Sequence, residues 1–254
     1  MNSKQYTRRF DVLFLMFRTI GLISLTCFVT ITLLGQKEKP QNYRRFDERL
    51  IHFGFMLGMN SASFLAYPKV DAYQSYGLKS LVSKSSMGGQ VGIVSTLRIG
   101  TPTVRLRLLP TLSFQERILE YTFENTIPEE KDITNTERVN STNIDIPLMF
   151  QFRTLRLNNF AAYVLAGGQY TIDLQSQQDA SQNYIDPFIK IKKNDFFGQV
   201  GGGVEFFAPF FKFGIELKYS RSFMNNFISE GTFIAKPVDK LFNNSWWLSF
   251  IFEG

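Results

Sequence analysis

The sequence predicts an all-β fold, an eight-stranded antiparallel transmembrane β-barrel with short periplasmic turns and long extracellular loops. Three observations predict it. Eight stretches alternate apolar with polar residues, their connections alternate short with long, and the chain begins with an export-type segment. Composition is ambiguous, because mean hydropathy is only -0.08 while 27 Phe and 10 Tyr supply an unusually large aromatic surface. A barrel reconciles the two, since half of each strand faces a polar lumen.

Residues 1–36 are predicted to be a signal peptide. A basic start precedes a mostly apolar run over residues 19–34, and Gly35 and Gln36 follow. A spanning helix needs about 20 apolar residues, so an uncleaved anchor is the less favoured alternative. Cleavage after Gly35 removes four basic residues and one acidic residue and lowers the net charge from +6 to +3. It also removes the single cysteine, Cys27. The high isoelectric point is therefore no argument for nucleic-acid binding.

Residues 37–50 are polar and charged without a hydrophobic period, which predicts a periplasmic linker before a barrel over residues 51–254. The first four predicted strands follow in order. Residues 52–60 set Phe, Leu and Met against Gly, and residues 89–99 set Val and Ile against Gln, Thr and Arg. Residues 104–114 set Leu and Val against two arginines, and residues 143–153 set Ile and Phe against Asp, Gln and Arg. Each has the period of two that a strand imposes.

The last four predicted strands are less uniform. Residues 161–174 form a weaker strand whose faces the pattern does not assign. Residues 198–206 set Val and Phe against Gln, Gly and Glu, and residues 211–220 alternate large apolar with charged residues. Residues 246–252 place one tryptophan, one leucine and two phenylalanines on one side. Tyr219, Trp246 and Trp247 near strand ends are typical of an interfacial girdle.

The two faces predict two environments. The side chains predicted to face lipid include Phe53, Phe55, Leu57, Phe150, Phe152, Phe211, Phe213, Ile215 and Leu217. The charged side chains predicted to form a structural network in the lumen are Arg98, Arg105, Arg107, Asp145, Arg153, Glu205, Lys212, Glu216 and Lys218. Because this set contains both positive and negative side chains, ion pairs can offset part of the free-energy cost of desolvating them. Plugging of the narrow lumen is favoured over an ion path, because eight strands leave little space.

The connections predict which side each loop occupies. The connections at residues 100–102, 154–159 and 208–209 are short, whereas those at residues 61–87, 124–141, 175–195 and 224–243 are long. Outer-membrane barrels have short periplasmic turns and long outer loops, whereas a soluble sandwich has no reason to sort its loops by length. Both chain ends then lie on the periplasmic side.

Pro110 and Pro147 fall inside the third and fourth predicted strands, where a missing N–H removes a ladder bond. A closed barrel has no free edge to accommodate them. We therefore expect a bulge or a lumen water at each, and the register there stays open.

Four stretches, RRFDERLIHFGFMLGMN, LRLLPTLSF, IDIPLMFQF and GGGVEFF, resemble the PorT-like outer-membrane barrels of Bacteroidetes. The similarity runs from about residue 42 to the carboxyl terminus. It implies a component of the type IX secretion system, which carries folded cargo to the cell surface. The implied partners are outer-membrane lipid and other type IX components. The family has no catalytic motif to transfer.

Two regions are candidate partner contacts. The charged segment before the first strand supplies Arg44, Arg45, Phe46, Asp47 and Arg49, and the long loops supply Tyr73, Tyr76, Phe227 and Phe233. Exposed aromatics among charges suit a protein interface. The equal alternative is that these loops fold over the barrel mouth.

The sequence predicts no enzyme, no cofactor, no metal site, and neither a nucleic acid nor a small molecule as ligand. His52 is the single histidine, and no Ser or Asp is placed beside it by spacing. The glycine-rich stretches at residues 88–92 and 201–207 lack the Lys–Ser/Thr of a phosphate cradle. Two functions remain open: a non-enzymatic component of protein secretion, or a stand-alone small barrel with a structural or adhesive role in the envelope.

Overall fold

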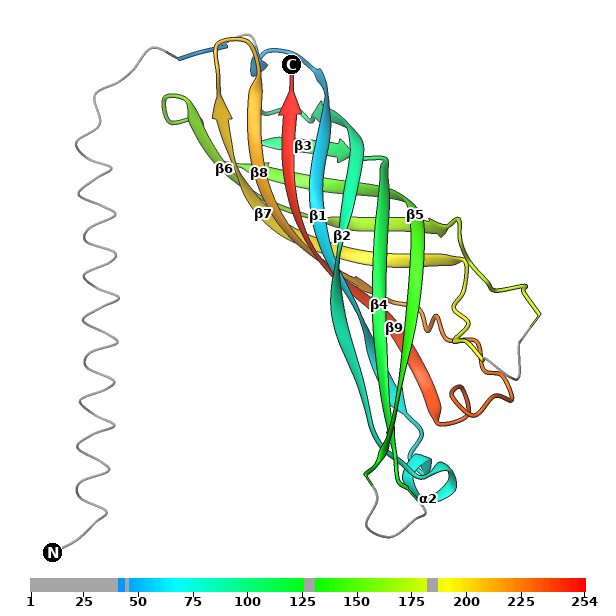
Figure 1. Ribbon diagram of the computed structural model, residues 1–254. Coiled ribbons are helices and arrows are strands. Elements are labelled where there is room, and N and C mark those ends of the chain that lie inside the picture. The colour runs from blue at the N-terminus through cyan, green and yellow to red at the C-terminus, as the bar shows by residue number, and fades with distance from the viewer. Residues whose placement is uncertain (1–40, 44–45, 126–130, 182–186) are drawn as a thin grey trace, which may run out of the picture. The chain divides into compact units, whose positions relative to one another are not determined.

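The computed structural model describes residues 41–43, 46–125, 131–181 and 187–254. The predicted signal peptide and the first part of the predicted linker lie outside these residues. Within them the chain is almost entirely β-structure (Figure 1). No helix in the described part is long and apolar enough to cross a membrane.

The strands form one closed antiparallel sheet. They are β1 (Ile51–Pro68), β2 (Leu78–Arg98), β3 (Val104–Leu108), β4 (Thr111–Phe123), β5 (Ile133–Arg153), β6 (Phe160–Asp173), β7 (Asn194–Phe207), β8 (Lys212–Ser222) and β9 (Val238–Glu253). A short helix, α2 (Ala72–Tyr76), joins β1 to β2. Neighbouring strands around the ring pair with each other, with β3 and β4 both lying between β2 and β5, and β1 pairs with β9, which closes the ring.

The nine strands occupy the eight predicted positions. Both β3 and β4 lie between β2 and β5, so together they form the third position of the barrel. The all-β antiparallel barrel predicted from the sequence is confirmed.

Pro110 and Pro147 both lie at the break between β3 and β4. The third position is interrupted at Leu109 and Pro110, while Pro147 stays in register with Gln169 of β6. The Pro147 carbonyl accepts a hydrogen bond from the Leu109 N–H at 3.2 Å, so the side of Pro147 that lacks a donor faces the interruption. In an antiparallel strand the N–H and C=O of one residue point the same way. Pro110 lacks its donor on the β2 side, since its carbonyl accepts from the Ile93 N–H at 3.0 Å, so the two ladders that flank the third position are interrupted at the same level.

The outer loops are shorter than predicted, because several strands continue beyond the expected loop boundaries. β1 runs on to Pro68 and β2 begins at Leu78, so most of the expected loop at residues 61–87 is strand, in which β1 pairs with β9 and β2 pairs with β4. β5 and β9 likewise begin inside the expected loops, at Ile133 and Val238. The local pattern hid these extensions, because inward residues such as Phe64 are apolar there and their outward neighbours are serines. That is the reverse of the pattern in the rest of the barrel.

The faces of the fifth predicted strand, which the sequence left open, are clear in β6. Tyr163, Gln169 and Asp173 are buried, whereas Val164 and Tyr170 are exposed. Tyr163 has room in the interior because a glycine stands opposite. A Cβ on Gly203 would lie 2.5 Å from the Ile215 carbonyl oxygen and 2.6 Å from the Tyr163 hydroxyl oxygen.

Candidate functional site in the barrel interior

The barrel interior is filled with charged side chains. Of the nine residues predicted to line the lumen, eight are buried and Arg98 is half-buried: Arg105, Arg107, Asp145, Arg153, Glu205, Lys212, Glu216 and Lys218. They come from β3, β5, β7 and β8, and the alternation of each strand turns them inward. The close packing of these side chains leaves the lumen occupied.

Glu205 on β7 is the centre of this network. Its carboxylate accepts hydrogen bonds from Lys212 Nζ at 2.7 Å and Gln151 Nε2 at 3.0 Å. Arg153 Nη1 lies 3.4 Å and Arg107 Nη2 lies 3.8 Å from its oxygens. One buried carboxylate thus pairs with cations from three strands, β3, β5 and β8, which offsets part of the cost of desolvating them.

Two further carboxylates complete the pairing. Glu216 accepts from Arg107 at 2.6 Å, from the Tyr163 hydroxyl at 2.7 Å, and pairs with Lys218 at 2.9 Å. Glu253, on β9, pairs with Lys212 and with Arg107. The sequence interpretation missed Glu253. The alternation of the last strand could have placed it, since the position after Phe252 faces inward.

Asp145 lies outside this pairing scheme. Its carboxylate accepts hydrogen bonds from Ser113 at 2.6 Å, Thr171 at 2.7 Å and Gln169 at 2.8 Å. It forms no ion pair within the described residues. Asp195, which the sequence did not single out, is held in the same way by Ser222 at 2.6 Å and Asn243 at 2.8 Å. The charged residues therefore do not form one network. Those around Glu205 form a cluster of ion pairs, and Asp145 and Asp195 each lie in a separate cluster of neutral polar side chains.

The segment before β1 belongs to the interior and corrects part of the predicted partner surface. Phe46 is fully buried, with its ring 3.8 Å from that of His52 and 5.7 Å from that of Phe207, between centroids. Two cations lie over the same ring, Lys212 at 4.9 Å and Arg105 at 5.2 Å. Phe46 was expected to be exposed because its sequence neighbours are charged. Those charges instead find partners inside the barrel.

Asp47 shows such pairing directly. Its carboxylate lies 2.6 Å from Arg153 Nη2, 3.1 Å from Arg105 Nη2 and 3.6 Å from Arg156 Nη1. Its carbonyl accepts from Arg98 at 2.9 Å. Asp47 is thus engaged by the barrel and not presented to a partner. Arg49 is exposed and donates to the Tyr43 hydroxyl at 3.2 Å, while Arg44 and Arg45 lie outside the described residues.

His52 has a structural environment. It is buried, and its Nε2 lies 2.5 Å from the Phe46 carbonyl oxygen. The Phe46 ring is tilted by 43° against its imidazole ring. These contacts hold the segment before β1 against the first strand.

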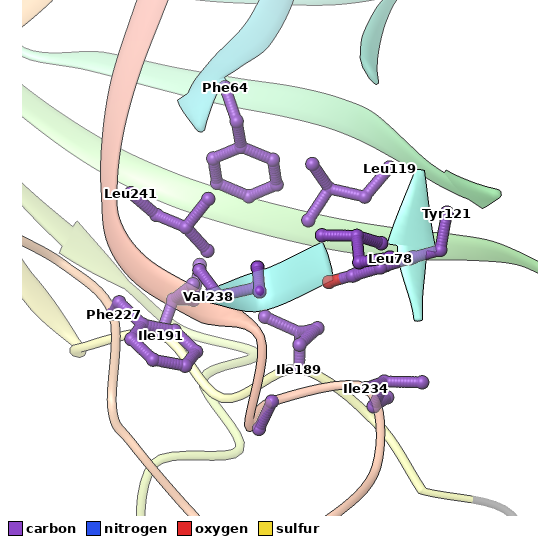
Figure 2. Close-up of a cluster of buried hydrophobic side chains, with 12 residues drawn as sticks. Phe64, Leu78, Leu119, Tyr121, Ile189, Ile191, Phe227, Ile234, Val238 and Leu241 are labelled. Atoms are coloured by element: carbon purple, nitrogen blue, oxygen red, sulfur yellow. The ribbon is translucent and has the colours of Figure 1, made fainter. Parts of the chain in front are cut away.

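The outer end of the barrel encloses an apolar core (Figure 2). Inward residues of the extended strands, including Phe64, Leu119, Tyr121 and Leu241, pack against side chains of the two outer loops. Those loop side chains are Ile189, Ile191, Phe227, Ile234 and Ala235. The loops also join each other, since Lys190 pairs with Glu230 at 2.6 Å and the Ile228 N–H donates to the Lys190 carbonyl at 3.1 Å.

Of the four loop residues predicted to contact a partner, one is buried in this core and three are exposed. Phe227 is buried in this core. The prediction that it is a partner contact is therefore wrong, because its ring packs inside the outer mouth of the barrel. Tyr73, Tyr76 and Phe233 are exposed. The Tyr73 hydroxyl donates to Glu124 Oε2 at 3.0 Å, and this hydrogen bond raises the pKa of Tyr73 above its ordinary value.

The predicted lipid-facing residues form the outer surface. Phe53, Phe55, Leu57, Phe150, Phe152, Phe211 and Leu217 are exposed, while Phe213 and Ile215 are half-covered by neighbours on the same face. The Phe213 ring lies 5.1 Å from that of Phe252, and the Tyr219 ring lies 5.0 Å from that of Trp246. A surface this apolar fits a hydrocarbon environment.

Replacement of Leu241 by alanine is expected to loosen the outer loops while the barrel stays folded. Leu241 is fully buried in the outer core, and a Leu-to-Ala change in such a place costs about 2–5 kcal/mol. The measurement is protease cleavage of the outer loops in intact cells, which should accelerate. Ile133→Ala is the matched control, because Ile133 is exposed and should leave the rate unchanged. Equal rates for the two variants would contradict the prediction.

Comparison with known proteins places the fold. Residues 35–228 match the family described as "Outer membrane protein beta-barrel domain". Among solved structures, the outer membrane protein OprG from Pseudomonas aeruginosa is similar with a TM-score of 0.41 and 14% identity, over 80% of this chain and 93% of that one. Neisserial surface protein A (NspA) is similar with a TM-score of 0.35 and 12% identity, over 78% and 95% of the two chains. No curated protein matches the sequence.

Proposed function

The chain belongs to the outer membrane protein beta-barrel domain family, and from that membership we propose that it is a non-enzymatic component of the type IX protein secretion system. It would act in the outer membrane through contacts with other components of that system, and not through a reaction or an open pore.

The stretch RRFDERLIHFGFMLGMN, residues 44–60, carries this proposal. It is the part of the chain whose resemblance to the PorT-like barrels is most particular. Phe46 and Asp47 of this stretch are bound to Arg105 and Arg153 in the interior, so the segment and the barrel form one unit. Because the residues that resemble the PorT-like barrels include a segment packed into the barrel, the resemblance supports a shared architecture between this chain and those barrels.

The packing of the interior supports action by contact. Glu205, Glu216 and Glu253 hold the arginines and lysines across the lumen, and the outer loops pack over the other end. A filled eight-stranded barrel leaves its rims and loops as the surfaces where partners bind.

Deletion of the gene tests the proposal. Secreted and periplasmic proteins are compared with and without the gene, and with the gene restored. The expected result is that cargo with type IX sorting domains accumulates in the periplasm and returns to the surface on restoration. An unchanged secretome would reject the proposal.

A stand-alone barrel with a structural or adhesive role is the second candidate. It is favoured by the apolar outer core, because loops packed by that core would present exposed side chains such as Tyr73 and Phe233 in a fixed arrangement at the cell surface. In that case deletion should leave secretion intact and change attachment of cells to surfaces or their resistance to detergent.

A further inference from the structure

Within the described residues, the side of β5 that faces β6 has no strand partner in the outer part of the barrel. β5 pairs with β4 along its whole outer half, as far as Ile133 opposite Phe123. On its other side the pairing with β6 ends at Asn143 opposite Asp173, and one further bond joins the Leu174 N–H to the Thr142 carbonyl at 2.8 Å. Residues 134–140, which we call the β5 edge, therefore have a strand on one side only. Figure 1 shows β4 and β5 continuing together beyond the end of β6.

The backbone groups of this edge are aligned for pairing. Since Thr142 points its carbonyl away from β4, the alternating residues Thr134, Thr136, Arg138 and Asn140 point theirs the same way. Within the described residues no backbone group bonds to them on that side. A row of free donors and acceptors of this kind is a template for another strand.

The corresponding edge of β9 is treated differently. Beyond Asn244, the last residue that pairs with β8, β9 also has one strand partner, β1. There the Asn226 N–H donates to the Leu241 carbonyl at 2.9 Å, and the Leu241 N–H donates to Asn225 Oδ1 at 3.0 Å. A loop of the chain thus makes hydrogen bonds along this edge of β9, whereas no described backbone group bonds along the β5 edge.

A hollow lies beside the β5 edge. Its volume is about 230 Å³, and it is bounded by residues 137–140 of β5, by Asp173 at the end of β6, and by residues 175–177, 188, 189 and 191 of the following loop. Val139, Phe188, Ile189 and Ile191 supply its apolar lining. A cavity of about 150 Å³ suffices for a benzene molecule, so this hollow has room for an aromatic or large aliphatic side chain.

We propose that the β5 edge is a docking surface for an extended segment of another protein. The segment adds to the sheet as a strand and places a large apolar side chain in the hollow. Main-chain hydrogen bonds would supply affinity, and the hollow would select the side chain. This inference rests on the proposed function for the identity of the partner, since a component that works by contact needs such a surface.

A second copy of this chain is a poorer occupant. An antiparallel copy that used the whole β5 edge would be centred on residue 137, which places Glu137 opposite Glu137. Like charges directly opposite each other destabilise a strand pair. A segment of another sequence carries no such restriction.

Thr136→Pro tests the proposal with little risk to folding. The Thr136 N–H faces the open side, so proline removes no bond to β4, and proline is accepted on edge strands. It does remove a donor that an added strand needs. Thr136→Val is the matched control, because it keeps the N–H and suits a strand. Heat-dependent migration on gels verifies that both variants are folded.

The probe is a fluorescein-labelled peptide that alternates threonine with phenylalanine and valine, with lysine at each end. Its binding to the full barrel in lipid nanodiscs is followed by fluorescence anisotropy. We expect saturable binding to the wild type and to Thr136→Val, and about tenfold weaker binding to Thr136→Pro. The same peptide N-methylated at alternate residues should not bind, because it cannot pair along both strands.

Three outcomes would overturn the inference. They are no binding of the peptide to the wild type, equal binding of the peptide to Thr136→Pro and the wild type, and equal binding of the N-methylated and unmodified peptides. A wild-type dimer that Thr136→Pro converts to a monomer, without peptide binding, would assign the edge to a second copy instead. Loss of secretion on gene deletion without peptide binding would reject this inference alone. Peptide binding with unchanged secretion would reject only the proposed function.

Discussion

Glu205→Ala is expected to lower the free energy of unfolding of the barrel by about 3–5 kcal/mol. Glu205 is buried and pairs with Lys212 at 2.7 Å and Arg153 at 3.4 Å, with Arg107 at 3.8 Å. Without the carboxylate, the three cations remain desolvated beside one another. Removal of one partner from a buried pair leaves an uncompensated charge, which costs far more than a surface pair contributes.

The measurement is a urea titration of the folded protein in lipid, followed by the fluorescence of Trp246 and Trp247 and by band migration. Glu120→Gln is the matched control. It breaks an ion pair with Lys84 at 2.5 Å, but 57% of the Lys84 side chain is exposed, so the loss should stay under about 1 kcal/mol. Similar midpoints for the two variants would show that the Glu205 cluster is not desolvated.

Phe46→Ala is expected to release the segment before β1 from the barrel mouth. Phe46 is fully buried between His52 and Phe207, and Lys212 and Arg105 lie over its ring. A buried Phe-to-Ala change costs about 3–5 kcal/mol. Because this segment precedes the first strand, the substitution should weaken the packing of the segment against the barrel and leave the pairing of the strands intact.

Trypsin cleavage after Arg49 measures the release. Proteolysis follows the population of the open form, so the rate in the folded protein should rise by about a hundredfold. Leu50→Ala is the control, because that side chain is 58% exposed and its loss should leave the rate unchanged. If both variants were cleaved at the wild-type rate, Asp47 and its arginines would suffice to hold the segment.

The β-barrel and the faces of most strands follow from local alternation. Lys212, Glu216 and Lys218 alternate with Phe213 and Leu217, and a strand can only send the two sets to opposite sides. The contrast between short and long connections then indicates which set faces inward. These features depend on neighbouring residues, so the sequence contains them in readable form.

The outer extensions were missed for a local reason as well. Along β1, Phe64 turns inward and the serines at positions 61 and 63 turn outward, the pattern of a half-buried soluble strand. A search for outward apolar residues ends at Met59. The apolar outer core appears only when Leu119, Leu241 and the loop residues around Phe227 are brought together.

The sequence by itself therefore determined the class of fold, the outer-membrane environment and the inward or outward direction of most side chains, because each depends on a period of two along one strand. The tertiary structure alone decided the pairing of Arg107 with Glu216 and Glu253, the burial of Phe46 and the open edge of β5. Each of these depends on the register between strands far apart in the chain and on the point where one strand outlasts its neighbour. No local pattern encodes such distances.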